Sequence, residues 1–247
     1  MFAMATFKVI LEYDGAGYAG WQRQLDQPTV QATVEDALAM VAQERIPLVG
    51  AGRTDAGVHA LGQVASFRTE TALTSGDWLR ALNALLPQDI CVRSVLQAPD
   101  AFHARYSAIG KLYEYRILNR PERSALERGR VWHLRKRLDV AAMRAAAATL
   151  VGLHDFSSFE NSPTENTNPM CRLDRLDVHS ESDLIRIEAY ADRFLRQMVR
   201  TIVGTLVEVG TGTRAIGSLQ AVLAAKARAA AGKTAPAHGL FLMRVDY

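Results

Sequence analysis

The sequence predicts an α+β protein made of two units, each with helices packed on a mainly antiparallel sheet. The first observation is length, since 247 residues form one large domain or two small ones. The second is composition: 49% apolar and 22% charged residues are typical of a soluble globular protein. The third is that segments with strand and helix periodicity alternate through both halves of the chain. We place the boundary near residues 99–107, which gives units 1–106 and 107–247.

The first half opens with a strand. Large apolar side chains occupy every second position of TFKVILEYD (6–14), which is the period of a half-buried strand. In DWLRALNALL (77–86), Asp77 is expected to cap a short helix that ends before Pro87. The other elements expected in this half are a helix at 29–44 and strands at 64–67 and 90–98.

The second half contains elements of the same kinds. An alanine-rich segment at 139–151 begins with Asp139 and predicts a capped helix. Residues 157–169, SSFENSPTENTNP, predict a polar loop. The other expected elements are helices at 194–209 and 216–229 and strands at 111–118, 172–180, 183–190 and 239–247.

Several classes of protein are excluded. No window of about 18 residues is apolar and uncharged, so we expect no membrane-spanning helix. The N-terminal residues MFAMATFKVILEYDG lack the basic and apolar regions of a signal peptide. Cys91 and Cys171 lie 80 positions apart without CxxC spacing, which predicts reduced thiols in a cytoplasmic protein.

Charge is distributed unevenly along the chain. Residues 1–100 carry 7 Lys+Arg against 11 Asp+Glu, a net charge of −4, so the remaining residues carry +7 of the total of +3. Residues 105–137 alone hold ten basic and three acidic groups. Such a run is either a solvated basic face or a surface that binds a polyanion such as nucleic acid. The charge does not distinguish these two interpretations.

Two glycine-rich segments resemble nucleotide-binding motifs without fulfilling them. GAGYAG (15–20) has GxGxxG spacing, but the glycines of a dinucleotide site open a helix. Here WQRQLDQP follows, and Pro28 precedes any helical periodicity. The second segment, GAGRTDAGVHA (50–60), lacks the GK[ST] of a phosphate-binding loop. We therefore expect no nucleotide cofactor.

The second segment has three interpretations. Arg53 and Asp55 could form an ion pair within the loop while His59 fills the core. Asp55 and His59 could bind a metal, although Gly57 argues against a rigid helix and no third ligand lies at suitable spacing. The third interpretation is that Asp55 is catalytic, because a carboxylate ionised near neutral pH is a usable nucleophile or base.

Two further segments could complete such a site. FLRQMVRTIVG (194–204) places Arg196 and Arg200 four residues apart, hence on one face of the expected helix. They are either surface residues with apolar stems or partners for a carboxylate from the acidic half. In KLYEYRI (111–117), Tyr113 and Tyr115 share a strand face. They are either ordinary sheet aromatics or a platform on which a nucleobase stacks.

Taken together, these motifs resemble the TruA family of tRNA pseudouridine synthases over nearly the full length. The matching segments are YDGAGYAGWQRQ (13–24), GAGRTDAGVHALGQV (50–64), GKLYEYRI (110–117), HDFSSF (154–159), FLRQMVRTIVG (194–204) and APAHGLFL (235–242). RTDAGVHA is a specific signature, and the other motifs follow in the family's order.

The resemblance implies a fold and an activity. The fold would be two ferredoxin-like units that share one continuous, mainly antiparallel sheet, with a basic cleft between them. The protein would be a homodimer in which one tRNA contacts both subunits. It would convert uridine to pseudouridine at positions 38, 39 and 40 of the tRNA anticodon stem-loop, without metal or organic cofactor.

The resemblance also implies residue roles. Asp55 would act on the nucleoside, whether by attack at C1′ or C6 or as a base at C2′. Arg200 would pair with Asp55, Tyr113 would stack on the uracil, and Arg53 would occupy the space that the extruded base leaves. His59 and Arg196 complete the expected substrate-binding set, with loop packing as the other interpretation of His59.

Two other functions remain in view. A non-catalytic RNA-binding protein on the same fold would explain the basic half and the tyrosines, but it would not explain an anion at Asp55. A metal-dependent nuclease would need further carboxylates around Asp55, which the sequence does not provide nearby.

Overall fold

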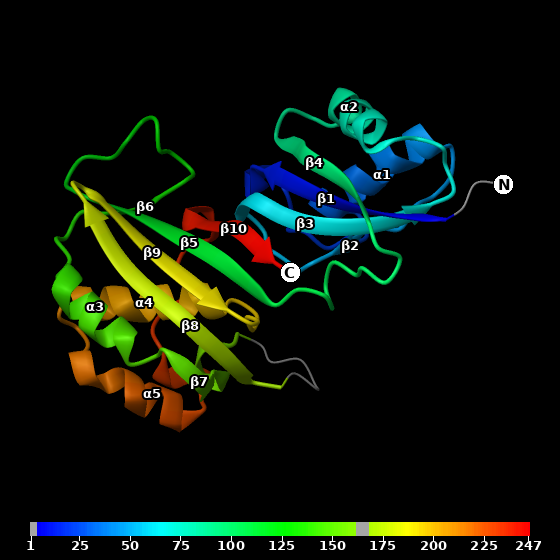
Figure 1. The fold of residues 1–247 in the computed structure, drawn as a ribbon. Helices are drawn as coiled ribbons and strands as arrows, with labels where there is room; N and C mark the ends of the chain where they lie inside the picture. Colours follow the sequence, from blue (N-terminus) through cyan, green and yellow to red (C-terminus); the bar gives the residue numbers. More distant parts are fainter. Residues whose placement is uncertain (1–3, 162–167) are drawn as a thin grey trace. The chain divides into compact units, whose positions relative to one another are not determined.

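The computed structural model describes residues 4–161 and 168–247 (Figure 1). They divide into two compact units. Unit 1 consists of the residues up to Ile109 together with Leu242–Tyr247, and unit 2 is Gly110–Phe241. The last residues of the chain therefore belong to unit 1, although the sequence predicted that they belong to the second unit. None of the helices described is long and apolar enough to cross a membrane.

Unit 1 is a mainly antiparallel sheet with two helices. Strand β1 pairs antiparallel with both β3 and β4, and the short β2 pairs with β3. The strand order is β4-β1-β3-β10. The strands are β1 (Ala5–Tyr13), β2 (Val49–Gly50), β3 (His59–Thr69), β4 (Ile90–Ala98) and β10 (Leu240–Asp246), and the helices are α1 (Val30–Ala42) and α2 (Ser75–Leu85).

Alternation along β1 creates the core of unit 1. Phe7 and every second residue after it are buried, as the sequence predicts. The Phe7 ring stacks on Phe67 of β3 with ring centroids 5.3 Å apart. Trp78 of α2 contacts Phe67 edge-on at 5.0 Å, so the helix covers this face of the sheet.

Unit 2 repeats the architecture, with helices packed on a mainly antiparallel sheet. Its strand order is β5-β9-β8-β7, all antiparallel, with β6 added parallel to β5. The strands are β5 (Gly110–Asn119), β6 (Trp132–Leu134), β7 (Gly152–Asp155), β8 (Met170–Glu181) and β9 (Leu184–Ala191). The helices are α3 (Val140–Ala148), α4 (Met198–Gly210) and α5 (Leu219–Ala225); α3 packs on β8 and α4, and in Figure 1 all three lie on one side of the strands.

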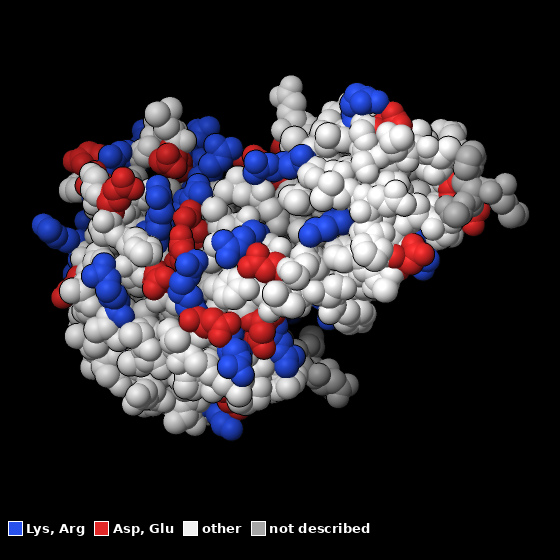
Figure 2. All heavy atoms as spheres, viewed as in Figure 1, with Lys and Arg blue, Asp and Glu red and all other residues white. Residues whose placement is uncertain are grey.

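The opposite face of the unit-2 sheet is charged. Arg175 on β8 contacts Glu188 at 2.9 Å and Asp177 at 3.4 Å, and Arg116 contacts Glu114 on β5 at 2.6 Å. Figure 2 shows the result as acidic and basic atoms interleaved over β8 and β9. The basic side chains named on this face are therefore paired with carboxylates. The net positive charge of the second half of the sequence did not show this pairing.

The mixed α+β class and the mainly antiparallel pairing agree with the prediction, whereas the ferredoxin-like character of each unit stays a prediction. Asp139 caps α3 as expected. Asp77, however, is not the cap of α2: the N-cap is Thr74, and Asp77 at the third helical position completes a capping box.

Other predicted elements differ in extent. The helix expected at 194–209 begins only at Met198, and that expected at 216–229 is shorter, with 3-10 turns on both sides of α5. Strands β2, β6 and β7 were not predicted, since two to four residues are too few to show a period. The expected polar loop contains a 3-10 turn at Ser157–Phe159, and its residues 162–167 lie outside those described.

Candidate active-site loop

The loop 51–58 joins β2 to β3 and carries the candidate nucleophile. Ala51 N–H donates to Val64 O at 2.8 Å, which continues the hairpin one residue beyond β2. Three consecutive residues then alternate in exposure: Arg53 is exposed, Thr54 is 6% exposed and Asp55 is half-buried. The loop thus turns Thr54 into unit 1, while Arg53 is exposed and Asp55 is partly accessible.

Thr54 is held by both its side chain and its backbone. Its hydroxyl lies 2.8 Å from the Tyr13 hydroxyl at the end of β1, and its carbonyl accepts Trp21 N–H at 3.0 Å. Burial raises the pKa of Tyr13 to about 12, so the phenol keeps its proton for this network. Gly20 has φ +104°, and a Cβ there would meet Thr54 O at 2.7 Å, so no larger residue fits beneath the loop.

The rest of the loop is fixed by its own turn and by β3. Val58 N–H donates to Asp55 O at 3.1 Å, and Gly57 between them has φ +75°. Gln63, fully buried on β3, donates its amide to Gly52 O at 3.0 Å. The carbonyls of Gly52 and Thr54, on the N-terminal side of Asp55, therefore both accept hydrogen bonds. These bonds restrict how the Asp55 carboxylate can move.

His59 supports the loop from within. Its ring is 2% exposed, and its Nδ1 lies 3.1 Å from Gly15 N–H and 3.0 Å from Asp14 Oδ1. One nitrogen cannot accept from Gly15 and donate to Asp14 at the same time, so the favoured contact depends on which ring nitrogen carries the proton. Both contacts tie the start of β3 to the end of β1, which favours loop support over contact with substrate.

Gly50 lies against a buried side chain of unit 1. A Cβ at Gly50 would lie 2.5 Å from Trp21 Nε1, so this glycine makes room for the buried indole. GAGYAG (15–20) opens no helix: Gly15–Gly17 forms a 3-10 turn, and α1 begins only at Val30.

Unit 2 holds the tyrosine and arginine candidates. Tyr113 on β5 is 7% exposed and contacts the Phe194 ring edge-on with centroids 5.1 Å apart. Tyr115 lies on the same face, as expected, and donates its hydroxyl to Pro236 O at 2.8 Å. Arg200, in the first turn of α4, donates Nε to Ala235 O at 2.8 Å.

Arg196 does not share a helix face with Arg200, so that prediction was wrong. Gln197 has a left-handed backbone, with φ 60°, and α4 begins after it. Arg196 is exposed in the preceding turn, where its carbonyl accepts Asn161 N–H at 3.1 Å. Met198, Ile202 and Val203 of α4 are buried.

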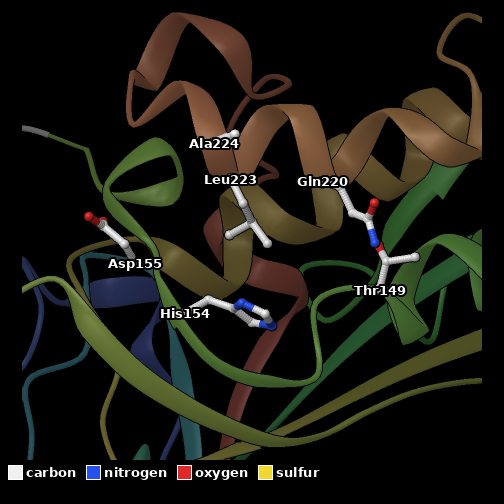
Figure 3. Close-up of a pocket in the computed structure, with 6 residues that line it drawn as sticks. All are labelled: Thr149, His154, Asp155, Gln220, Leu223 and Ala224. Carbon is white, nitrogen blue, oxygen red and sulfur yellow. The ribbon is translucent and has the colours of Figure 1, made fainter.

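The HDFSSF motif fastens α5 rather than forming part of the loop described above. Asp155 accepts hydrogen bonds from Ser157 and pairs with Lys226 at 3.1 Å, while Ser158 bonds Val222 O and Ala227 N–H at the end of α5. A hollow of about 380 Å³ lies between this motif and α5. Figure 3 shows its lining residues, with the Asp155 carboxylate directed away from the His154 ring.

Among residues 4–161 and 168–247, one group of three metal-ligand side chains lies close together: Asp177, His179 and Glu188. Arg175 already contacts both carboxylates, and a guanidinium there opposes a cation. Neither Asp55 nor His59 belongs to this group.

Comparison with known proteins matches residues 9–107 and 146–247 to a family described as tRNA pseudouridine synthase. Three relatives, each named tRNA pseudouridine synthase A, come from Afipia carboxidovorans (45% identical), Rhodopseudomonas palustris strain BisA53 (46%) and Mesorhizobium japonicum (46%). Each alignment covers 99% of this chain and 100% of the relative.

Proposed function

The chain belongs to the tRNA pseudouridine synthase family, and we propose that it isomerises uridine at positions 38, 39 and 40 of the tRNA anticodon stem-loop. The enzyme is thus an isomerase with tRNA as substrate. In this reaction the N1–C1′ bond breaks and a C5–C1′ bond forms. C5 loses its hydrogen as a proton and N1 gains one, so the atoms balance without an oxidant, a reductant or a second substrate.

Asp55 is the proposed nucleophile or base. The observation that carries this proposal is the inward anchoring of Thr54, which leaves the next side chain half-exposed on a fixed turn. A positioned carboxylate contributes most when it needs no rearrangement to reach the reacting atom. Arg53, exposed on the other side of Thr54, is proposed to fill the space left by the extruded base, which a planar guanidinium can do while contacting phosphate.

Arg200 and Tyr113 are the proposed partners from unit 2. A guanidinium has five N–H donors, so the Nε bond from Arg200 to Ala235 O is compatible with a second, ionic partner such as Asp55. The Tyr113 ring, held edge-on by Phe194, is the proposed surface for the target uracil. Arg196 is exposed and suited to contact phosphate, and His59 supports the loop.

We further propose a cytoplasmic homodimer in which one tRNA contacts both subunits. Support comes from the motif resemblance, and light scattering of the purified protein with and without tRNA tests it. A monomer in both conditions would refute this part alone.

The activity is tested by tritium release from tRNA labelled at uracil C5, because forming the C5–C1′ bond expels that hydrogen. Asp55→Asn removes the charge at nearly constant shape, and Asp100→Asn, at an exposed aspartate of unit 1, is the matched control. The assay is run with and without EDTA, because a synthase that needs no metal should release tritium equally in both conditions. Binding of unlabelled tRNA is measured in parallel.

We expect release by the wild type and the control with or without EDTA, and none by Asp55→Asn, which still binds tRNA. Binding without release by the wild type would support a non-catalytic RNA-binding protein. Equal release by wild type and Asp55→Asn would retain the reaction but remove Asp55 from it.

A further inference from the structure

A second hollow, of about 350 Å³, lies in unit 2 between the basic segment after β5 and the APAHGLFL motif. Its charged and aromatic lining residues are Arg123, Glu127, Arg128, Trp132, His133 and His238. Two parts of the sequence more than 100 residues apart thus meet here. Neither has a role in the chemistry proposed for Asp55.

On one side of the hollow, the segment that carries His238 is held by hydrogen bonds from Arg200 and Tyr115. Arg200 donates Nε to Ala235 O and accepts Ala235 N–H at its own carbonyl, 3.0 Å away. Tyr115 donates to Pro236 O, and a Cβ at Gly239 would lie 2.6 Å from the Tyr115 ring. The backbone around His238 therefore lies directly on Tyr115 and is tied to the arginine proposed to partner Asp55.

The opposite wall is fixed by β6. This strand pairs in register with the end of β5, and Trp132 contacts the Tyr115 ring edge-on at 6.3 Å. His133 Nε2 lies 2.9 Å from Arg120 O, which ties β6 to the basic segment. The hollow is thus largely formed before any ligand enters, as small-molecule and nucleotide sites usually are.

The charges of the hollow have no internal partners. Arg123 and Arg128 are exposed, and within the described residues neither guanidinium has a hydrogen bond or ion pair. Glu127 is the single acid among the described lining residues. By contrast, Arg175 on the β8–β9 face contacts two carboxylates. Unpaired arginines beside an aromatic ring and the apolar side chains of Leu118 and Val131 favour an anion with an apolar part.

We propose that this hollow binds the phosphodiester backbone of the tRNA, with Arg123 and Arg128 on phosphate and Trp132 against the adjoining ribose. The proposal rests on the function proposed above. It also specifies a region of the substrate: Tyr113 and Leu118 are five residues apart on β5, or about 17 Å along a strand, so the bound phosphates lie away from the target uridine.

The test is Arg123→Gln combined with Arg128→Gln, two exposed sites where folding should be unaffected. The matched control is Arg45→Gln with Arg68→Gln, two exposed arginines of unit 1, which lowers the net charge by the same two units. For each protein, KM and kcat for tRNA and the dissociation constant are measured over a series of salt concentrations.

The rise in KM and the dissociation constant of the Arg123/Arg128 variant over wild type should be about tenfold larger at about 50 mM than at about 200 mM salt, since each phosphate contact accounts for about a threefold change in affinity over that range. The slope of log affinity against log salt should become shallower by about 1 to 2, with kcat near the wild-type value because uniform binding is lost. Trp132→Leu should raise KM without changing the slope, because the indole carries no charge.

The inference is overturned if the Arg123/Arg128 variant matches the control in KM, dissociation constant and salt slope. That result would leave the proposed reaction intact, because the wild type would still release tritium. A wild type that binds tRNA with the predicted salt dependence but releases no tritium would refute the proposed reaction and leave the phosphate site standing.

Discussion

Removing the Tyr13 hydroxyl is the sharpest test of how the loop is positioned. Tyr13→Phe keeps the ring and deletes the oxygen that lies 2.8 Å from Thr54 Oγ1, in a fully buried site. A buried hydroxyl left without its partner costs about 1–3 kcal/mol, so we expect a loss near 2 kcal/mol. For a chain of this size that is a fall in Tm of about 4–8 °C. We also expect kcat to fall about tenfold, because Asp55 follows Thr54 directly and catalysis is sensitive to small displacements.

Thr54→Val and the double variant complete the measurement. Replacing both partners with apolar groups of similar shape is nearly neutral, so the Tyr13→Phe/Thr54→Val protein should regain part of the lost Tm. Its kcat should stay low, because the bond that positions the loop is still missing. Calorimetry and tritium release supply the two readouts. If Tyr13→Phe has the wild-type Tm and kcat, Thr54 is not the anchor of this loop.

Three further predictions concern stability and thiol chemistry. Gly20→Ala should lower stability by more than about 2 kcal/mol, because its Cβ meets Thr54 O and its φ is +104°; chemical denaturation measures this, and a neutral effect would remove the glycine's role. Hydrogen bonds from Ser157 and the Lys226 ammonium hold the pKa of Asp155 below its usual value, despite burial. The carboxylate therefore stabilises the fold above about pH 4 and loses this contribution as pH falls through its folded pKa, so Asp155→Asn should be less stable than wild type at pH 7 but not at pH 2. Burial raises the pKa of the Cys171 thiol to about 11, whereas Cys91 is exposed, so iodoacetamide at pH 8 should label Cys91 alone in the native protein; mass spectrometry showing equal labelling would contradict this.

The periodic spacing of apolar residues predicted those strands and helices in which buried and exposed side chains recur at a regular interval. The alternation in 6–14 matches β1, and 90–98 matches β4 residue for residue. The start of α4 was missed because Phe194 and Leu195 continue an apolar pattern, while the left-handed backbone of Gln197 leaves no trace in that pattern. The capping box of α2 could have been found, since Thr74 and Asp77 have its spacing. The return of 242–247 to unit 1 depends on long-range packing, which periodicity does not report.

For the site, the sequence supplied the loop but not its supports. RTDAGVHA marked Arg53 and Asp55 as unusual because charges and glycines coincide there. Two of the bonds that fix the loop join distant residues: Tyr13 and Thr54 are 41 positions apart, and Gly15 and His59 are 44 positions apart. No local spacing could pair them, and in a strand pattern Tyr13 looks like any other buried aromatic.

The side chains that hold the loop are buried polar groups of unit 1, and there is a physical reason why polar groups suit this role. Apolar side chains beneath the loop would bury more apolar surface, but they would allow the loop several positions, since hydrophobic contact has no direction. The hydroxyl of Tyr13, the ring of His59 and the amide of Gln63 each require one geometry, because a buried polar group without its partner is costly. Satisfying all of them at once restricts the loop to an arrangement in which Thr54 is turned inward and Asp55 is half-buried. The energy that orders the carboxylate is therefore supplied during folding, so binding of the tRNA need not provide it.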